Sequence, residues 1–131
     1  MSSARQKRKV FVIDDERGFM RMVKLNLEAT GDYDVKIQNN PHDALSSAIE
    51  FKPDVILLDV IMPELEGPDV VYQFKNQEML RDIPVIFITA NITKEEVDAQ
   101  EGYIGGHAFL AKPGTIEELI SCIEKQFKNS R

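Results

Sequence analysis

Short apolar runs alternate along the chain with longer segments of helical periodicity. Five runs rich in β-branched and aromatic residues predict strands at residues 9–13, 33–37, 54–58, 83–88 and 106–111. Apolar residues recur at helical spacing in two other segments, at Phe19, Met22, Val23 and Leu27 and at Ile116, Leu119, Ile120, Ile123 and Phe127. Five alternations with short connections predict a single α/β domain, in which helices cover both faces of a parallel five-stranded sheet.

Polar residues mark where several of the helices are expected to begin. Asn40-Pro41 is typical of a cap followed by a proline in the first helical turn. The segments 93–96 and 115–118 both match the capping box, in which a threonine hydroxyl and a glutamate carboxylate satisfy each other's backbone donors. These signals predict a helix after the second, fourth and fifth strands.

The charge of the chain is unevenly distributed. The 131 residues carry a net charge of −6, but four of the 16 basic residues lie between Arg5 and Lys9, ahead of all 22 acidic residues. Residues 10–131 therefore combine twelve basic with 22 acidic residues, a net charge of −10, which argues against nucleic-acid binding by the domain. We expect residues 1–8 to form a basic, solvated and disordered tail, and residues 9–128 to form the domain.

Cysteine usage and hydropathy predict the compartment. Cys122 is the only cysteine, so the chain cannot form an intrachain disulfide or a zinc cluster of thiolates. No apolar stretch approaches the length of a membrane span, which is about 18 residues or more. The apolar run from Val10 to Ile13 is too short for a signal peptide. We therefore expect a cytoplasmic protein that does not insert into membranes.

Polar residues directly follow four of the predicted strands. Asp14 and Asp15 follow the first strand, Asp59 the third, Thr89 the fourth and Lys112 the fifth. Because the carboxyl ends of parallel strands meet at one edge of the sheet, three carboxylates, a hydroxyl and a lysine are expected to converge there. Such a set predicts a phosphoryl-transfer site built around a divalent cation.

The acids at this edge require a counter-charge. In the strand order 2-1-3-4-5, the first and third strands are neighbours at the point where ligands bind in open α/β sheets. Asp14, Asp15 and Asp59 would then share one small site, where two like charges about 4 Å apart repel by roughly 4 kcal/mol at an effective dielectric constant of about 20. A hard divalent cation removes this repulsion, and Mg²⁺ suits a site that keeps water and meets a phosphoryl group.

Four sequence elements resemble the receiver domain of two-component response regulators. They are the pair Asp14-Asp15, the stretch from Asp59 to Gly67, the pair Thr89-Ala90, and the stretch from Gly105 to Pro113. Thr89 lies 30 residues after Asp59, and Lys112 lies a further 23 residues along the chain. The resemblance extends over residues 9–127 and implies a flavodoxin-like fold, a doubly wound parallel sheet of order 2-1-3-4-5 with helices on both faces.

The resemblance implies a role for each residue of the acidic edge. Asp59 would accept a phosphoryl group from a phosphohistidine on a sensor histidine kinase or a phosphotransfer protein. Asp14 and Asp15 would hold Mg²⁺ together with Asp59 and the backbone carbonyl of Ile61. Lys112 would pair with Asp59 and later with a phosphoryl oxygen.

Two residues would connect phosphorylation to a change of shape. Thr89 would follow the phosphoryl group with its hydroxyl, and Phe109 would turn inward as the space near Thr89 closes. The domain would catalyse only its own phosphorylation and dephosphorylation, and would switch the binding of a downstream protein target or a fused output domain. The implied regulator is either a stand-alone protein or the receiver part of a longer one.

Three other functions compete with this interpretation. A haloacid-dehalogenase-type phosphatase needs a second aspartate two residues after its nucleophile, where this chain has Ile61. A flavin-binding protein of the same fold class needs a first loop that cradles a phosphate, and the acids at 14–16 would repel one. A docking module that is never phosphorylated is the third alternative, against which the complete set of five polar site residues argues.

Overall fold

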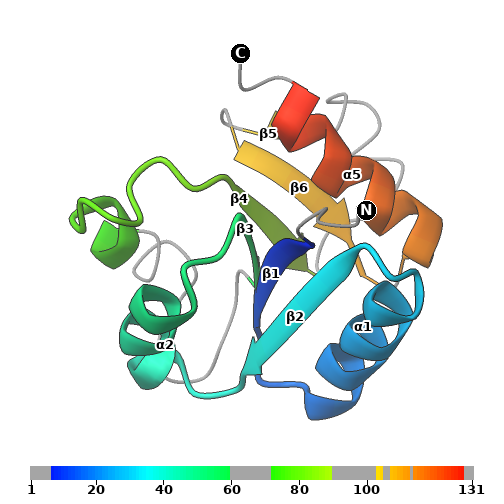
Figure 1. Cartoon of the computed structure of the whole chain (residues 1–131), viewed down its shortest axis with the longest axis horizontal. Helices are drawn as coiled ribbons and strands as arrows, with labels where there is room; N and C mark the ends of the chain where they lie inside the picture. The colour runs from blue at the N-terminus through cyan, green and yellow to red at the C-terminus, as the bar shows by residue number, and fades with distance from the viewer. Residues whose placement is uncertain (1–6, 60–71, 90–102, 105–106, 113, 129–131) are drawn as a thin grey trace, which may run out of the picture.

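The computed structural model describes residues 7–59, 72–89, 103–104, 107–112 and 114–128. Its elements follow in the order β1 (Arg8–Ile13), α1 (Arg17–Ala29), β2 (Tyr33–Gln38), the 3₁₀ helix η1 (Pro41–Asp43), α2 (Ala44–Phe51), β3 (Val55–Asp59), β4 (Val85–Thr89), β5 (Tyr103–Ile104), β6 (His107–Ala111) and α5 (Ile116–Lys128) (Figure 1). Residues 72–75 form one further helical turn. Among the described helices, none combines the length and the apolar character of a membrane span.

A single sheet forms the centre of the fold. Its strand order is β2-β1-β3-β4-β6-β5, and the pairs along β2, β1, β3, β4 and β6 are all parallel. These are the five parallel strands that the sequence predicts, in the predicted order. The additional strand β5 has two residues and pairs antiparallel with β6. A two-residue strand is too short to produce a period-2 pattern, so the sequence does not predict it.

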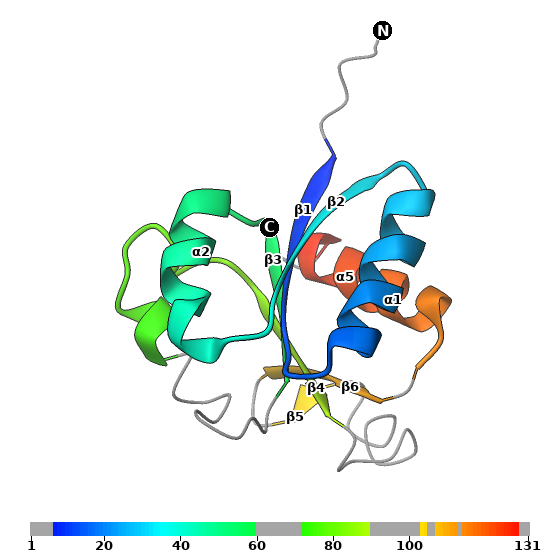
Figure 2. The ribbon, with the colours of Figure 1, turned by 90° about the horizontal axis from the view of Figure 1, so that it is seen from below.

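Alternate residues of the strands enter two different cores. In β1, Val10 and Val12 belong to one core, whereas Phe11 and Ile13 belong to the other. Helices α1 and α5 cover the first face of the sheet, and α2 covers the second (Figure 2). All four side chains are fully buried, as expected for a parallel sheet with helices on both faces.

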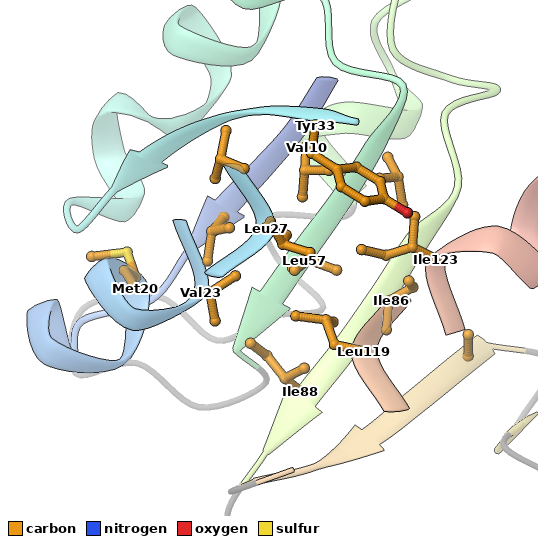
Figure 3. Packing of buried hydrophobic residues seen from close by; sticks show 14 residues of the cluster. Val10, Met20, Val23, Leu27, Tyr33, Leu57, Ile86, Ile88, Leu119 and Ile123 are labelled. Atoms are coloured by element: carbon orange, nitrogen blue, oxygen red, sulfur yellow. The ribbon is translucent and has the colours of Figure 1, made fainter. Parts of the chain in front are cut away.

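The core beneath α1 and α5 joins both helices to the central strands. In Figure 3, Leu27 of α1 and Leu119 and Ile123 of α5 lie over Leu57 and Ile86 of the sheet. Burial of an aliphatic side chain of this size contributes roughly 1.5–3 kcal/mol. The core therefore fixes both helices against the strands whose carboxyl ends carry the polar residues.

The buried face of α1 differs from the predicted one at two positions. Val23 and Leu27 are buried as predicted, but Met20 is buried with them and Met22 is 40% exposed. Residues three or four positions apart share one face of a helix, whereas adjacent residues are separated by about 100° around the axis. Met22 therefore lies outside the stripe that Met20, Val23 and Leu27 form.

Two of the predicted helix starts lie within the described residues, and both are confirmed. Before α5, the backbone N–H of Glu118 donates to Thr115 Oγ1 at 3.1 Å, and the backbone N–H of Thr115 donates to Glu118 Oε1 at 3.0 Å. Before η1, Asn40 Oδ1 accepts a hydrogen bond of 2.9 Å from the backbone N–H of His42. The capping box predicted at residues 93–96 lies outside the described residues.

The basic N-terminal run enters the sheet earlier than predicted. Arg8 is the first residue of β1 rather than the last residue of a tail. Its Nε lies 3.2 Å from Glu124 Oε2, and its guanidinium carbon lies 3.8 Å from the centre of the Phe127 ring. Strand pairing and these contacts with α5 offset the cost of ordering this side chain. Residues 1–6 lie outside the described residues.

Candidate functional site

The carboxyl ends of the parallel strands meet at one edge of the sheet (Figure 2). Ile13 of β1 pairs with Leu58 of β3. Asp14 and Asp59 directly follow these two residues, so the parallel register makes them neighbours at this edge. The proximity that the sequence predicts for these two acids therefore follows from strand pairing alone.

Thr89 and Lys112 complete the same edge from two further strands. Thr89 ends β4 and pairs with Ala111, which ends β6. The backbone N–H of Lys112 donates to the carbonyl oxygen of Thr89 at 2.8 Å, which fixes where the lysine side chain leaves the sheet. Both side chains are largely inaccessible to water, with Thr89 and the Lys112 side chain each 6% exposed.

Three carboxyl groups form a cluster at this edge. Oxygen atoms of Asp14, Asp15 and Asp59 all lie within 4.8 Å of one another. Asp14 and Asp59 are buried, whereas Asp15 is exposed. Two ionised carboxylates at such a separation repel by roughly 4 kcal/mol at an effective dielectric constant of about 20. The cluster therefore requires positive charge close by.

The ammonium group of Lys112 supplies part of that charge. Its Nζ lies 2.6 Å from Glu16 Oε1, 2.7 Å from Asp14 Oδ2 and 3.7 Å from Asp59 Oδ2. The centre of the Phe19 ring lies 4.5 Å from the same nitrogen, close enough for a favourable cation–π contact. Asp59, the partner that the resemblance implies for Lys112, is thus the most distant of the three acids around it.

Burial and charge change the pKa values at the site. Burial raises the pKa of Asp14, and the charge of Asp59 adds to this, although Lys112 and the backbone N–H of Glu16 oppose it. Asp15 is exposed, yet partial loss of hydration raises the pKa of its carboxyl, and Asp14 raises it further. Burial alone would lower the pKa of Lys112, but the contacts with Asp14 and Glu16 outweigh it and raise that pKa. Lys112 therefore stays charged beside acids that one ammonium group cannot neutralise.

The oxygen atoms of the cluster fit a hard divalent cation. Asp14 Oδ2 is buried and accepts no hydrogen bond of regular geometry from the described residues, although Lys112 Nζ approaches it as an ion pair. Asp15 gives the cluster an exposed carboxylate. Hard divalent cations take carboxylate oxygens as ligands, and the smaller ones keep several water molecules. The further ligand that the resemblance implies, the carbonyl of Ile61, lies outside the described residues.

Comparison with known proteins identifies the family. The family model of the response regulator receiver domain matches residues 10–124. The chain belongs to this family. Membership of the receiver family accounts for the fold of this domain.

The relatives of this receiver domain differ in length. It is 34% identical over 116 residues to the polar-differentiation response regulator DivK of Brucella anthropi, over 88% of this chain and 92% of that protein. It is 32% identical over 124 residues to the alkaline phosphatase synthesis transcriptional regulatory protein PhoP of Bacillus subtilis, over 94% of this chain and 50% of that protein. The chain therefore spans about half the length of PhoP but most of the length of DivK.

Solved receiver structures have the same fold. The chemotaxis protein CheY4 of Vibrio cholerae superimposes with a TM-score of 0.77 at 29% identity, over 92% of this chain and 98% of that chain. The Francisella response regulator 1452 receiver domain superimposes with a TM-score of 0.75 at 27% identity, over 95% of this chain and 100% of that chain. The predicted family and the predicted strand order are both confirmed.

The structure also describes the surroundings of Phe109 and Glu16. Phe109, the residue expected to turn inward, is half-buried, and its ring centre lies 5.1 Å from that of Phe87. Glu16 was not predicted as a site residue, yet it makes the shortest contact with Lys112. The sequence signal that could have identified it is its position directly after the acidic pair and directly before a helix.

Proposed function

We propose that this receiver domain accepts a phosphoryl group on Asp59 from a histidine kinase or a phosphotransfer protein, in a reaction that depends on Mg²⁺. The observation that supports this most is the acidic cluster, with three carboxylates within 4.8 Å of one another and Lys112 in contact with it. Phosphorylation then changes the binding of a downstream protein target or a fused output domain. A chain that cannot form an intrachain disulfide is consistent with a cytoplasmic location.

The chemistry assigns one task to each side chain. A carboxylate oxygen of Asp59 attacks the phosphorus atom, while the bond from phosphorus to the donor nitrogen breaks and its electron pair stays on that nitrogen. Lys112 donates hydrogen bonds to the oxygens of the transferring group and balances their charge. Asp14, Asp15 and Asp59 would hold Mg²⁺, which would supply further positive charge. The domain catalyses only its own phosphorylation and dephosphorylation.

Labelling by a small phosphodonor tests this function. Incubation of the protein with the donor and Mg²⁺ should add the mass of one phosphoryl group, in a linkage that acid and base both hydrolyse. The same incubation in EDTA should give no adduct. A protein that is never labelled, by the small donor or by a phosphohistidine protein, would instead be the unphosphorylated docking module.

Asp14→Asn is expected to make the metal-free domain more stable and to weaken its stabilisation by Mg²⁺. Because burial raises the pKa of Asp14 in the folded state, ionisation of this carboxyl lowers the free energy of unfolding. This cost is absent below the unfolded pKa of about 3.9 and appears as the pH rises through the raised folded value. In EDTA the wild type should therefore be less stable than Asp14→Asn at pH 7, and the difference should shrink as the pH falls toward 4. Urea unfolding measures both forms.

The gain in the free energy of unfolding that Mg²⁺ should produce can be calculated. A ligand at one hundred times its dissociation constant, bound only to the folded state, adds about 2.7 kcal/mol to the free energy of unfolding. Wild type and a control, Asp82→Asn, should gain this amount, because the exposed Asp82 precedes β4 at the opposite edge of the sheet. Equal gains in Asp14→Asn and the control would contradict the assignment of Asp14 to the metal.

Thr89→Ala is expected to accept phosphate but to lose the change of shape. Phosphorylation adds a charge of about −1.5 to −2 beside Thr89. Thr89 ends β4, and β4 pairs with β6, the strand that contains Phe109. Hydrogen exchange of residues 107–111 should change on phosphorylation in wild type and in Ser46→Ala, which removes an exposed hydroxyl on α2. In Thr89→Ala it should stay unchanged. A normal exchange response in Thr89→Ala would show that this hydroxyl does not transmit the signal.

A further inference from the structure

Glu16 contacts Lys112 although neither its own helix nor the acidic cluster requires that contact. It is the N-cap residue of α1 but makes no side-chain cap hydrogen bond, and Ser, Thr, Asp and Asn are the residues preferred at such a position. It does not belong to the three-acid cluster. Its Oε1 instead accepts a hydrogen bond of 2.6 Å from Lys112 Nζ, across 96 positions of the chain.

The backbone of Glu16 is held by two hydrogen bonds, whereas its side chain is exposed. Its N–H donates to Asp14 Oδ1 at 3.0 Å, and its carbonyl oxygen accepts from the N–H of Met20 at 3.1 Å. The side chain is 63% exposed, so water can hydrate the carboxylate when it leaves the lysine. The contact between Glu16 and Lys112 therefore costs little free energy to break, because water can replace the lysine. The contact of Lys112 with the fully buried Asp14 costs more.

The distances around Lys112 show which acids determine the position of its ammonium group. An ammonium group has three donors, but the short contacts with Glu16 and Asp14 hold Nζ 3.7 Å from Asp59 Oδ2, which is beyond hydrogen-bond distance. A phosphoryl group on Asp59 would need a donor from this same nitrogen. Asp14 is buried and cannot move into water, so Glu16 is the acceptor that can be exchanged.

We propose that Glu16 is a positioning residue that holds Lys112 back from Asp59 in the unmodified domain. During phosphorylation one N–H of Lys112 changes its acceptor from Glu16 Oε1 to a phosphoryl oxygen, while the lysine keeps all its protons. This inference rests on the proposed function. Loss of the Glu16 contact should therefore speed phosphorylation, because the donor no longer has to be withdrawn from a carboxylate.

The expected effect is moderate, since one partner of the contact is exposed. Exposed ion pairs contribute at most about 1 kcal/mol, which corresponds to about a fivefold change in rate. We expect Glu16→Gln to raise the maximal rate of phosphorylation by a small phosphodonor by about three- to fivefold, with little change in the donor concentration at half-maximal rate. Glu50→Gln, which removes an exposed charge on α2, should leave the rate unchanged.

Two further variants separate this mechanism from simple charge repulsion. Glu16→Asp keeps the charge, but its side chain is one methylene shorter on a fixed backbone and should not reach Lys112. Its rate of phosphorylation should therefore rise as in Glu16→Gln. If repulsion of the donor by the charge were the cause, Glu16→Asp would react at the wild-type rate. In a Lys112→Ala background, Glu16→Gln should have no effect. Acceleration that persists without Lys112 would overturn the proposal.

The contact can also be observed without phosphorylation. The ¹⁵N signal of the Lys112 ammonium group in the unmodified protein should shift in Glu16→Gln and should not shift in Glu50→Gln. An unshifted signal would overturn the proposal. If wild type is not labelled, the proposed function fails; if wild type is labelled and Glu16→Gln is no faster, only the role of Glu16 fails.

Discussion

Asp59→Ala is expected to abolish labelling of the domain by small phosphodonors and by phosphohistidine proteins. Asp59 ends a buried strand, is 7% exposed itself, and has a carboxylate oxygen 3.7 Å from the Lys112 ammonium group. Alanine has no nucleophilic oxygen, so the expected loss is complete rather than partial. Intact-mass spectrometry after incubation with donor and Mg²⁺ measures it directly.

The control for this variant is a change of the same kind at an acid outside the cluster. Asp82→Ala removes an exposed carboxylate at the opposite edge of the sheet and should be labelled like wild type. Circular dichroism should show that Asp59→Ala is folded, because the change removes one charge from a group of acids that repel each other. Labelling of Asp59→Ala at the wild-type level would mean that another residue accepts the phosphoryl group.

Lys112→Ala is expected to slow phosphorylation by about a hundredfold or more, since loss of one preorganised donor to a developing charge costs about 10²–10³ in rate. Its ammonium group is largely buried, contacts Asp14 and Asp59, and keeps its charge because the surrounding acids raise its pKa. The rate constant for labelling at saturating donor and Mg²⁺ measures the effect. Asp59 should remain the labelled residue, because Lys112 supplies charge and not the nucleophile.

Lys125→Ala is the matched control for that change. Lys125 is an exposed lysine on α5, so its removal changes the net charge equally without touching the acidic edge. The control should react at the wild-type rate. A Lys112→Ala rate within about twofold of wild type, less than 0.5 kcal/mol of barrier, would contradict the role given to this lysine.

The parallel sheet and most of its edge follow from local features of the sequence. The apolar runs of β1 and β3 end at an aspartate, and parallel pairing of Ile13 with Leu58 then makes Asp14 and Asp59 neighbours. Thr89 and Lys112 meet for the same reason, because each stands at or directly after the end of a strand. Residues at strand ends are therefore well predicted, since their position depends on backbone pairing and not on side-chain conformation.

Features that depend on side-chain reach or on very short elements were not predicted. The contact of Glu16 with Lys112 joins residues 96 positions apart and requires a particular conformation of two long side chains. The ordering of Arg8 depends on Glu124 and Phe127 in the last helix, which no local pattern indicates. The strand β5 has only two residues. For Glu16 and Arg8 the deciding interaction lies outside the window in which periodicity can be read, whereas β5 is too short to produce a periodic pattern.

The central claim is that the acidic edge directs one phosphoryl group to Asp59. Reduction of the labelled wild-type protein with borohydride converts an acyl phosphate into a stable alcohol, whose position tandem mass spectrometry can identify. After incubation with a small phosphodonor and Mg²⁺, we predict a single modified residue, Asp59, and none after incubation in EDTA. Modification at Asp14 or Asp15 instead, or equal modification of Asp59 in EDTA, would contradict the account.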